Sequence, residues 1–130
     1  MDLSQLKTVK SDEGATLQIL HPSTMEPIEG MTITLLGQDS QVYRKLSLGK
    51  QQAALNRMNK GKKAADLDAE KLSEDSINDL VKLTVSWTGF ERDGKPVEFT
   101  DVNVKNIYHE FPFIREQAQE FIADRANFFR

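Results

Sequence analysis

Two stretches decide the fold of this chain, Ala15-Thr16-Leu17-Gln18-Ile19-Leu20 and Met31-Thr32-Ile33-Thr34-Leu35-Leu36. Apolar and polar side chains alternate along both, which is typical of strands with one buried face. The segment between them, residues 21–30, holds two prolines and a glycine, so the strands are predicted to pair as an antiparallel hairpin with a long loop. Because a two-stranded ribbon is marginal alone, we expect its apolar face to lie on helices or on another copy of the protein.

Capping residues and apolar periodicity predict about four helices after the hairpin. Asp39 or Ser40 can cap the first, Thr100 can cap the third, and Pro112 suits the first turn of the last. Asp93-Gly94 is predicted to form a tight turn. The expected helices cover residues 40–58, 74–87, 101–110 and 112–127.

These elements predict one domain over residues 1–130, of the α+β class and mainly α. The N-terminal antiparallel β-hairpin occupies about 15–36, and the helical part occupies about 40–128. A flexible basic linker is predicted at about 59–70, around the Lys-Gly-Lys-Lys sequence.

The composition excludes several classes of protein. The chain has 130 residues, no cysteine, 17 Lys and Arg against 20 Asp and Glu, and two histidines. Without cysteine there is no disulfide framework and no thiolate nucleophile, which fits a reducing compartment such as the cytoplasm. The first residues lack the features of a signal peptide, and no apolar run approaches the roughly 20 residues that span a bilayer. We therefore expect neither export nor membrane insertion.

No catalytic or metal-binding arrangement of residues is recognised in the sequence. His21 and His109 stand in no HxxxH or HxxE arrangement, so no metal site is predicted. The pairs Gly49-Lys50 and Gly61-Lys62 lack the following hydroxyl of a phosphate-binding loop, so no nucleotide site is predicted. We expect no catalytic residue, no cofactor and no enzymatic activity.

Charge is segregated along the chain. Residues 44–63 hold seven basic residues and no acidic one, whereas residues 64–130 hold 14 acidic residues against eight basic. This pattern is typical of a solvated helix face followed by a linker, or of a basic patch for an acidic partner or a nucleic acid. Nucleic acid is disfavoured, because the whole chain is acidic and no aromatic residue alternates with the lysines. Lys60, Lys62 and Lys63 are the candidate partner-binding residues of this segment.

The adjacent rings of Phe128 and Phe129 form a second candidate partner-binding site. Neighbouring residues on a helix point about 100° apart, so both rings face one core stripe only if the helix end is enclosed. We expect one ring to stay free for a partner.

The C-terminal half carries a family resemblance, in Val85-Ser86-Trp87-Thr88-Gly89-Phe90, in Asp93-Gly94-Lys95-Pro96-Val97-Glu98-Phe99-Thr100, in Phe111-Pro112-Phe113-Ile114-Arg115-Glu116-Gln117 and in the end from Phe121 to Phe129. With these motifs the chain resembles the tail assembly chaperones of long-tailed, lambda-like bacteriophages over roughly residues 80–130. None of the motifs is catalytic. Trp-Thr-Gly and Asp-Gly-Lys-Pro are interpreted as a helix end, a turn and a helix cap.

The resemblance implies a non-structural factor that binds the tape measure protein, keeps it soluble, and is displaced as tail tube subunits polymerise. It implies a place in the cytoplasm of the infected bacterial host and not in the mature virion. Family members are commonly also made as a longer, frameshifted form that recruits the tail tube protein, and this chain would be the short form. A coat for a long helix needs many copies, so we also expect a homo-oligomer.

Two other functions are left open by the residues. One is a small nucleic-acid-binding or regulatory module that uses residues 44–63. The other is a minor structural tail protein, which the predicted elements disfavour because small tail proteins often have a sheet-rich core.

Overall fold

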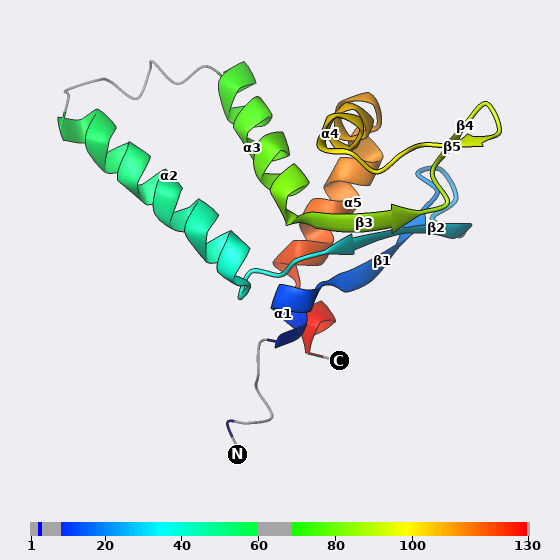
Figure 1. Cartoon of the computed structure of the whole chain (residues 1–130), viewed down its shortest axis with the longest axis horizontal. Coiled ribbons are helices and arrows are strands. Elements are labelled where there is room, and N and C mark those ends of the chain that lie inside the picture. Colours follow the sequence, from blue (N-terminus) through cyan, green and yellow to red (C-terminus); the bar gives the residue numbers. More distant parts are fainter. Residues whose placement is uncertain (1–2, 4–8, 60–68, 130) are drawn as a thin grey trace.

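The structure is a computed structural model, and it describes residue 3 and residues 9–59 and 69–129. The fold is α+β and mainly α, as predicted, with an N-terminal antiparallel hairpin followed by helices (Figure 1). The elements follow in the order α1 (Val9–Glu13), β1 (Ala15–Leu20), β2 (Pro27–Leu35), α2 (Gln41–Asn59), α3 (Ala69–Leu83), β3 (Thr84–Thr88), β4 (Glu91–Arg92), β5 (Lys95–Pro96), α4 (Asp101–Glu110), α5 (Pro112–Ala123) and the 3₁₀ helix η3 (Arg125–Phe128).

The predicted hairpin is confirmed. β1 and β2 are antiparallel, with Ala15 opposite Leu35 and Leu17 opposite Ile33. β2 begins at Pro27 rather than at Met31, which a proline at the first position of a strand allows.

The helix predicted over residues 74–87 is wrong at both ends. α3 begins at Ala69 and ends at Leu83, and residues 84–88 form a third strand that pairs antiparallel with β2. Trp87 faces Ile33 across the pair, and the β-branched and aromatic side chains of Thr84-Val85-Ser86-Trp87-Thr88 suit a strand better than a helix. The sheet order is therefore β1-β2-β3, and Trp87-Thr88-Gly89 ends a strand rather than a helix.

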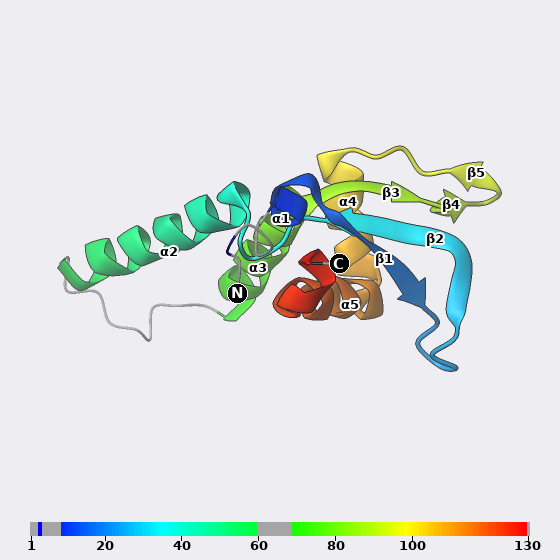
Figure 2. The same ribbon diagram turned by 90° about the horizontal axis from the view of Figure 1, so that it is seen from below.

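Helices of the same chain cover one face of this sheet, as Figure 1 and Figure 2 show. α5 packs on β1 and β2, and α4 packs on α3 and α5. The opposite face is polar, with hydroxyl pairs between Thr16 and Thr34 at 3.2 Å and between Thr32 and Thr88 at 2.6 Å. The buried core between sheet and helices consists of Ile19, Ile33, Leu35, Leu36, Ile77, Leu80, Leu83, Phe90, Val104, Ile107, Tyr108, Ile114, Ala118 and Ile122.

Three helices begin at their predicted start signals, two with a side-chain cap and one with a proline. The Ser40 hydroxyl accepts from the Tyr43 amide at 3.1 Å at the start of α2, and Thr100 does the same for Asn103 in α4. Pro112 opens α5. This last helix ends at Ala123 and not at residue 127, because the chain there turns into η3.

Most of the predicted linker at 59–70 falls on residues that the structure does not describe, and its two ends are helical. Asn59 ends α2, while Ala69 and Glu70 belong to α3. Residues 60–68 lie outside the described residues. The sequence pattern did not predict the short helix α1. In the described ranges, none of the helices combines the length and the apolar character needed to cross a bilayer.

Candidate apolar binding groove

The residues predicted to bind a partner have different places in the structure. Lys60, Lys62 and Lys63 lie outside the described residues. Phe128 is only 1% exposed and packs edge-to-face on Phe121, with ring centres 5.5 Å apart. The prediction that Phe128 contacts a partner is therefore wrong, because its ring belongs to the interior. Phe129 is 42% exposed and remains a candidate.

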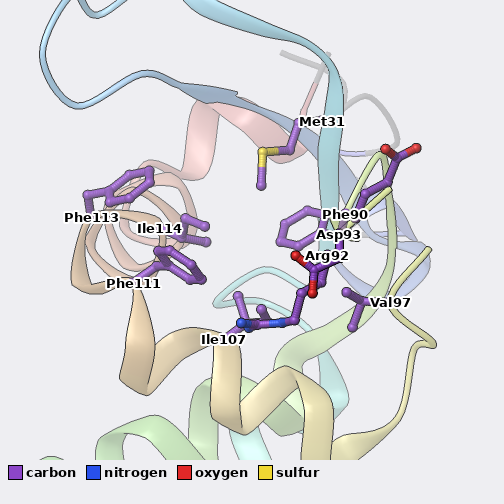
Figure 3. A pocket seen from close by; sticks show the side chains of 10 residues that line it. Met31, Phe90, Arg92, Asp93, Val97, Ile107, Phe111, Phe113 and Ile114 are labelled. Atoms are coloured by element: carbon purple, nitrogen blue, oxygen red, sulfur yellow. The ribbon is translucent and has the colours of Figure 1, made fainter. Parts of the chain in front are cut away.

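A groove of about 340 Å³ opens where β2, the β4–β5 turn, the end of α4 and the start of α5 meet (Figure 3). Its lining is mostly apolar, with charged groups at one side. The residues that line it are Met31, Phe90, Glu91, Arg92, Asp93, Val97, Ile107, Phe111, Phe113 and Ile114.

The junction of α4 and α5 builds one wall. α4 cannot continue through Phe111, because the following proline disfavours helical geometry there, and Phe111 adopts φ −123° and ψ 81°. Phe111 and Phe113 are half-buried and pack edge-to-face with ring centres 6.1 Å apart. Two partly covered rings thus stand at a fixed bend of the chain.

The β4–β5 ribbon builds the opposite wall. Asp93 and Gly94 have φ of 55° and 78°, so the predicted tight turn is confirmed and has the positive φ angles of a type I′ hairpin. Trp87 stacks on Phe90 at 4.5 Å, and its indole N–H donates to the Val97 carbonyl at 3.2 Å. These contacts hold Phe90 and Val97 in the wall.

Charged side chains line the rim beside this ribbon. Arg92 donates two hydrogen bonds to the Glu110 carboxylate, at 3.2 and 2.6 Å. These bonds and the opposite charge lower the pKa of Glu110 and raise the pKa of Arg92. Both groups are solvent-exposed, so the pair orients the rim more than it stabilises the fold. Glu91 and Asp93 add two further carboxylates.

A second cleft, of about 630 Å³, lies between α2 and α3. Its walls are largely charged, and the Lys50 ammonium lies 2.6 Å from the Asp79 carboxylate. Basic groups of α2 therefore face acidic groups of α3, so part of the basic charge is already paired. That pairing disfavours a phosphate-binding surface here.

Apolar walls with a few charged groups at the rim suit the apolar stripe of an amphipathic helix. Within residues 9–59 and 69–129, no three His, Asp or Glu side chains are grouped so as to hold a metal ion.

Sequence patterns did not identify the groove residues as a site. Phe90, Val97 and Phe113 come from separate segments that only the fold brings together. The sequence does carry one signal for such a site. Aromatic residues are concentrated near the C-terminus, in a greater number than the buried stripe of one helix needs. No family model, curated protein or solved structure matches the chain.

Proposed function

We propose that this protein is a tail assembly chaperone of a long-tailed bacteriophage, which binds the tape measure protein and keeps it soluble during tail assembly. The observation that carries the proposal is the apolar groove with its charged rim. All of its lining residues except Met31 come from residues 90–114, inside the stretch that resembles the family.

The groove suits the physical task of such a chaperone. A tape measure protein is a long helix whose apolar stripe would aggregate without cover. A half-open apolar groove binds a few side chains of that stripe weakly, and many copies along the helix turn weak contacts into a stable coat. Weak single contacts also allow tail tube subunits to displace the coat.

The remaining parts of the proposal follow from the same role. The chaperone acts in the cytoplasm of the infected host and leaves before the virion is complete. A longer, frameshifted form of the chain would bring tail tube protein to the coated tape measure.

The test is co-expression with the tape measure protein of the same phage. Val97→Asp puts a charge in the groove wall, and Val102→Asp makes the same change at an exposed position of α4 outside the groove. The wild-type chain and the Val102 variant should raise the soluble yield of the tape measure protein severalfold. The Val97 variant should not, although its circular dichroism should match the wild type.

Two results would contradict the proposal. A wild-type chain that leaves the soluble yield unchanged rules out the chaperone function, and a folded Val97 variant with full effect rules out the groove. Phe129→Ala and charge reversal at Lys60, Lys62 and Lys63 test the other candidate residues in the same assay.

A further inference from the structure

The walls of the apolar groove are rich in aromatic rings. Phe111 and Phe113 stand on one side of it, and Phe90 and Met31 stand on the other (Figure 3). A ring that enters such a space packs edge-to-face on its neighbours, and the methionine thioether adapts to its shape. With a volume of about 340 Å³, the groove takes a few side chains rather than a whole helix. It therefore suits a partner helix with a large apolar anchor, an aromatic one above all.

The rim of the groove has an excess of negative charge. Glu91, Arg92 and Asp93 all line it and are all exposed. The Arg92 guanidinium is bonded to the Glu110 carboxylate, and none of the ion pairs between described residues involves Glu91 or Asp93. Lys95 lies opposite Arg92 in the ribbon but does not line the groove. Three carboxylates thus stand against one guanidinium.

The fold keeps these carboxylates beside the apolar wall. Glu91 follows Phe90 directly in the chain, and the Val97 amide donates to the Phe90 carbonyl at 2.8 Å. The tight turn with Asp93 at φ 55° closes the same ribbon. A helix whose anchor enters the groove places its next turn roughly 5 Å along its axis. The long side chain of a lysine or arginine at that turn can reach the rim.

We propose that the groove selects partner helices in which a large apolar anchor has a lysine or an arginine one turn away on the same face. The anchor enters between the rings, and the cation faces Glu91 and Asp93. The inference rests on the proposed function only in taking the groove as the place where a partner helix binds, and it adds which helices are bound. Opposite charge at a rim acts mainly on the association rate and on the choice of partner.

The experiment measures binding of synthetic helical peptides to the full chain by fluorescence anisotropy of a dye on the peptide. Each peptide carries a leucine–phenylalanine–leucine stripe. The peptides differ only at two positions of the same face, three residues before and four residues after the phenylalanine, which hold lysine, glutamine or glutamate. The lysine peptide should bind about tenfold more tightly than the glutamate peptide, with the glutamine peptide between them. This ratio should fall toward one as salt is added.

The rim variant, Glu91→Gln with Asp93→Asn, removes both carboxylates and keeps the size of the side chains. Asparagine tolerates the positive φ of position 93, so the turn should persist. This variant should bind the three peptides with equal affinity, close to that of the wild type for the glutamine peptide. The Val97→Asp variant should lose binding of all three, because its change lies in the apolar wall.

A matched control removes two carboxylates elsewhere. Glu13→Gln with Glu120→Gln changes the net charge by the same amount at exposed positions that do not line the groove. Glu13 ends α1, which lies at the other end of the sheet from the β4–β5 ribbon in both Figure 1 and Figure 2. The control should keep the wild-type preference for lysine.

The possible failures separate this inference from the proposed function. Equal binding of the three peptides by the wild type, a rim variant that still prefers lysine, or a control that loses the preference would each overturn the selection by the rim, while the groove would remain the proposed binding site. If no peptide binds, or if the Val97→Asp variant binds all three normally, the groove is not a helix-binding site. The inference then fails, and the proposed function loses the observation that carries it.

Discussion

At the scale of single residues, one buried hydroxyl pair links two helices and the sheet. Thr84 donates to the Leu80 carbonyl at 2.7 Å, and the Tyr108 hydroxyl lies 2.7 Å from the Thr84 oxygen. Since the proton of Thr84 is already used, Tyr108 is the donor of the second bond. Thr84 is the first residue of β3, so the pair connects α3, β3 and α4.

The two partners of this pair should respond unequally to mutation. Thr84→Val leaves the Tyr108 hydroxyl buried without an acceptor, which costs about 1–3 kcal/mol of unfolding free energy. Tyr108→Phe leaves Thr84 bonded to Leu80, so its cost should be smaller, on the order of 1 kcal/mol. Urea unfolding of both variants measures the difference. A Tyr108 variant that is the less stable of the two would contradict this assignment of donor and acceptor.

Burial of Tyr108 also makes stability depend on alkaline pH. Burial raises the pKa of Tyr108 to about 12, from 10.0 for the exposed side chain. The unfolded chain therefore releases this proton first, and its contribution to stability is present below pH 10 and lost as pH rises toward 12. The loss should reach roughly 3 kcal/mol. Unfolding free energies at pH 9 to 11 should fall less steeply for the Tyr108→Phe variant than for the wild type. Equal slopes would show that ionisation of Tyr108 does not contribute to the pH dependence of stability.

Phe128 and Phe129 show what the spacing of residues on a helix can and cannot predict. Their angular separation on a helix predicted that one ring would be free, but it could not say which. Asp124 ends α5 and accepts from the Ala126 amide at 3.1 Å, which starts η3 and turns the Phe128 ring inward. Local hydrogen bonds decide the change from the α-helix α5 to the 3₁₀ helix η3. The spacing of apolar residues does not predict such a change.

At the scale of elements, the hairpin, α2, α4 and the start of α5 could be predicted because their signals are local. Alternation, capping residues and Pro112 each act within a few positions. β3 could not be predicted in this way, because Ile77, Leu80 and Thr84 continue a helical spacing into it. Its strand conformation is decided by pairing with β2, some fifty residues earlier in the chain. The groove escaped prediction for the same reason, since three separate segments form it.

The end of β3, at Gly89, lies close to the backbone of Gly30. The stability of the protein should therefore be sensitive to a single methyl group added at Gly89. Gly89 has φ of 74°, and a Cβ there would overlap the Gly30 carbonyl, 2.8 Å from its carbon. Gly94 has φ of 78° with open space around it. Gly94→Ala should cost about 1 kcal/mol for backbone strain, and Gly89→Ala should cost about 1–3 kcal/mol more.

Thermal unfolding of the two glycine variants separates strain from overlap. Both substitutions force alanine into a left-handed conformation, so the Gly94 variant is the control for that common effect. Equal melting temperatures would show that β3 can move away from β2 without loss. A lower value for the Gly89 variant would show that the backbone approach is fixed.

At the scale of the whole molecule, Phe128 near the C-terminus packs against segments from earlier in the chain. A Cβ added to Gly37, between β2 and α2, would lie 2.9 Å from the Phe128 ring, so the ring packs directly on this backbone. The Gly37 amide also donates to the Ser11 carbonyl of α1 at 3.0 Å. Segments from the beginning, the middle and the end of the chain therefore meet around Phe128.

The burial of Phe128 in these contacts predicts that two adjacent residues contribute very unequally to stability. Phe128→Ala removes a fully buried ring and should lower the unfolding free energy by about 3–5 kcal/mol, whereas Phe129→Ala at a 42% exposed position should change it by about 0.5 kcal/mol or less. Urea unfolding followed by tryptophan fluorescence and by circular dichroism should give one coincident transition, because Trp87 reports on the sheet and the dichroism on the helices.

Truncation after Asn127 should resemble the Phe128 variant. A loss of chaperone activity on truncation therefore reports unfolding, unless the Phe129→Ala variant shows the same loss. A Phe128 variant as stable as the wild type would show that η3 is dispensable and that the rest of the molecule folds without it.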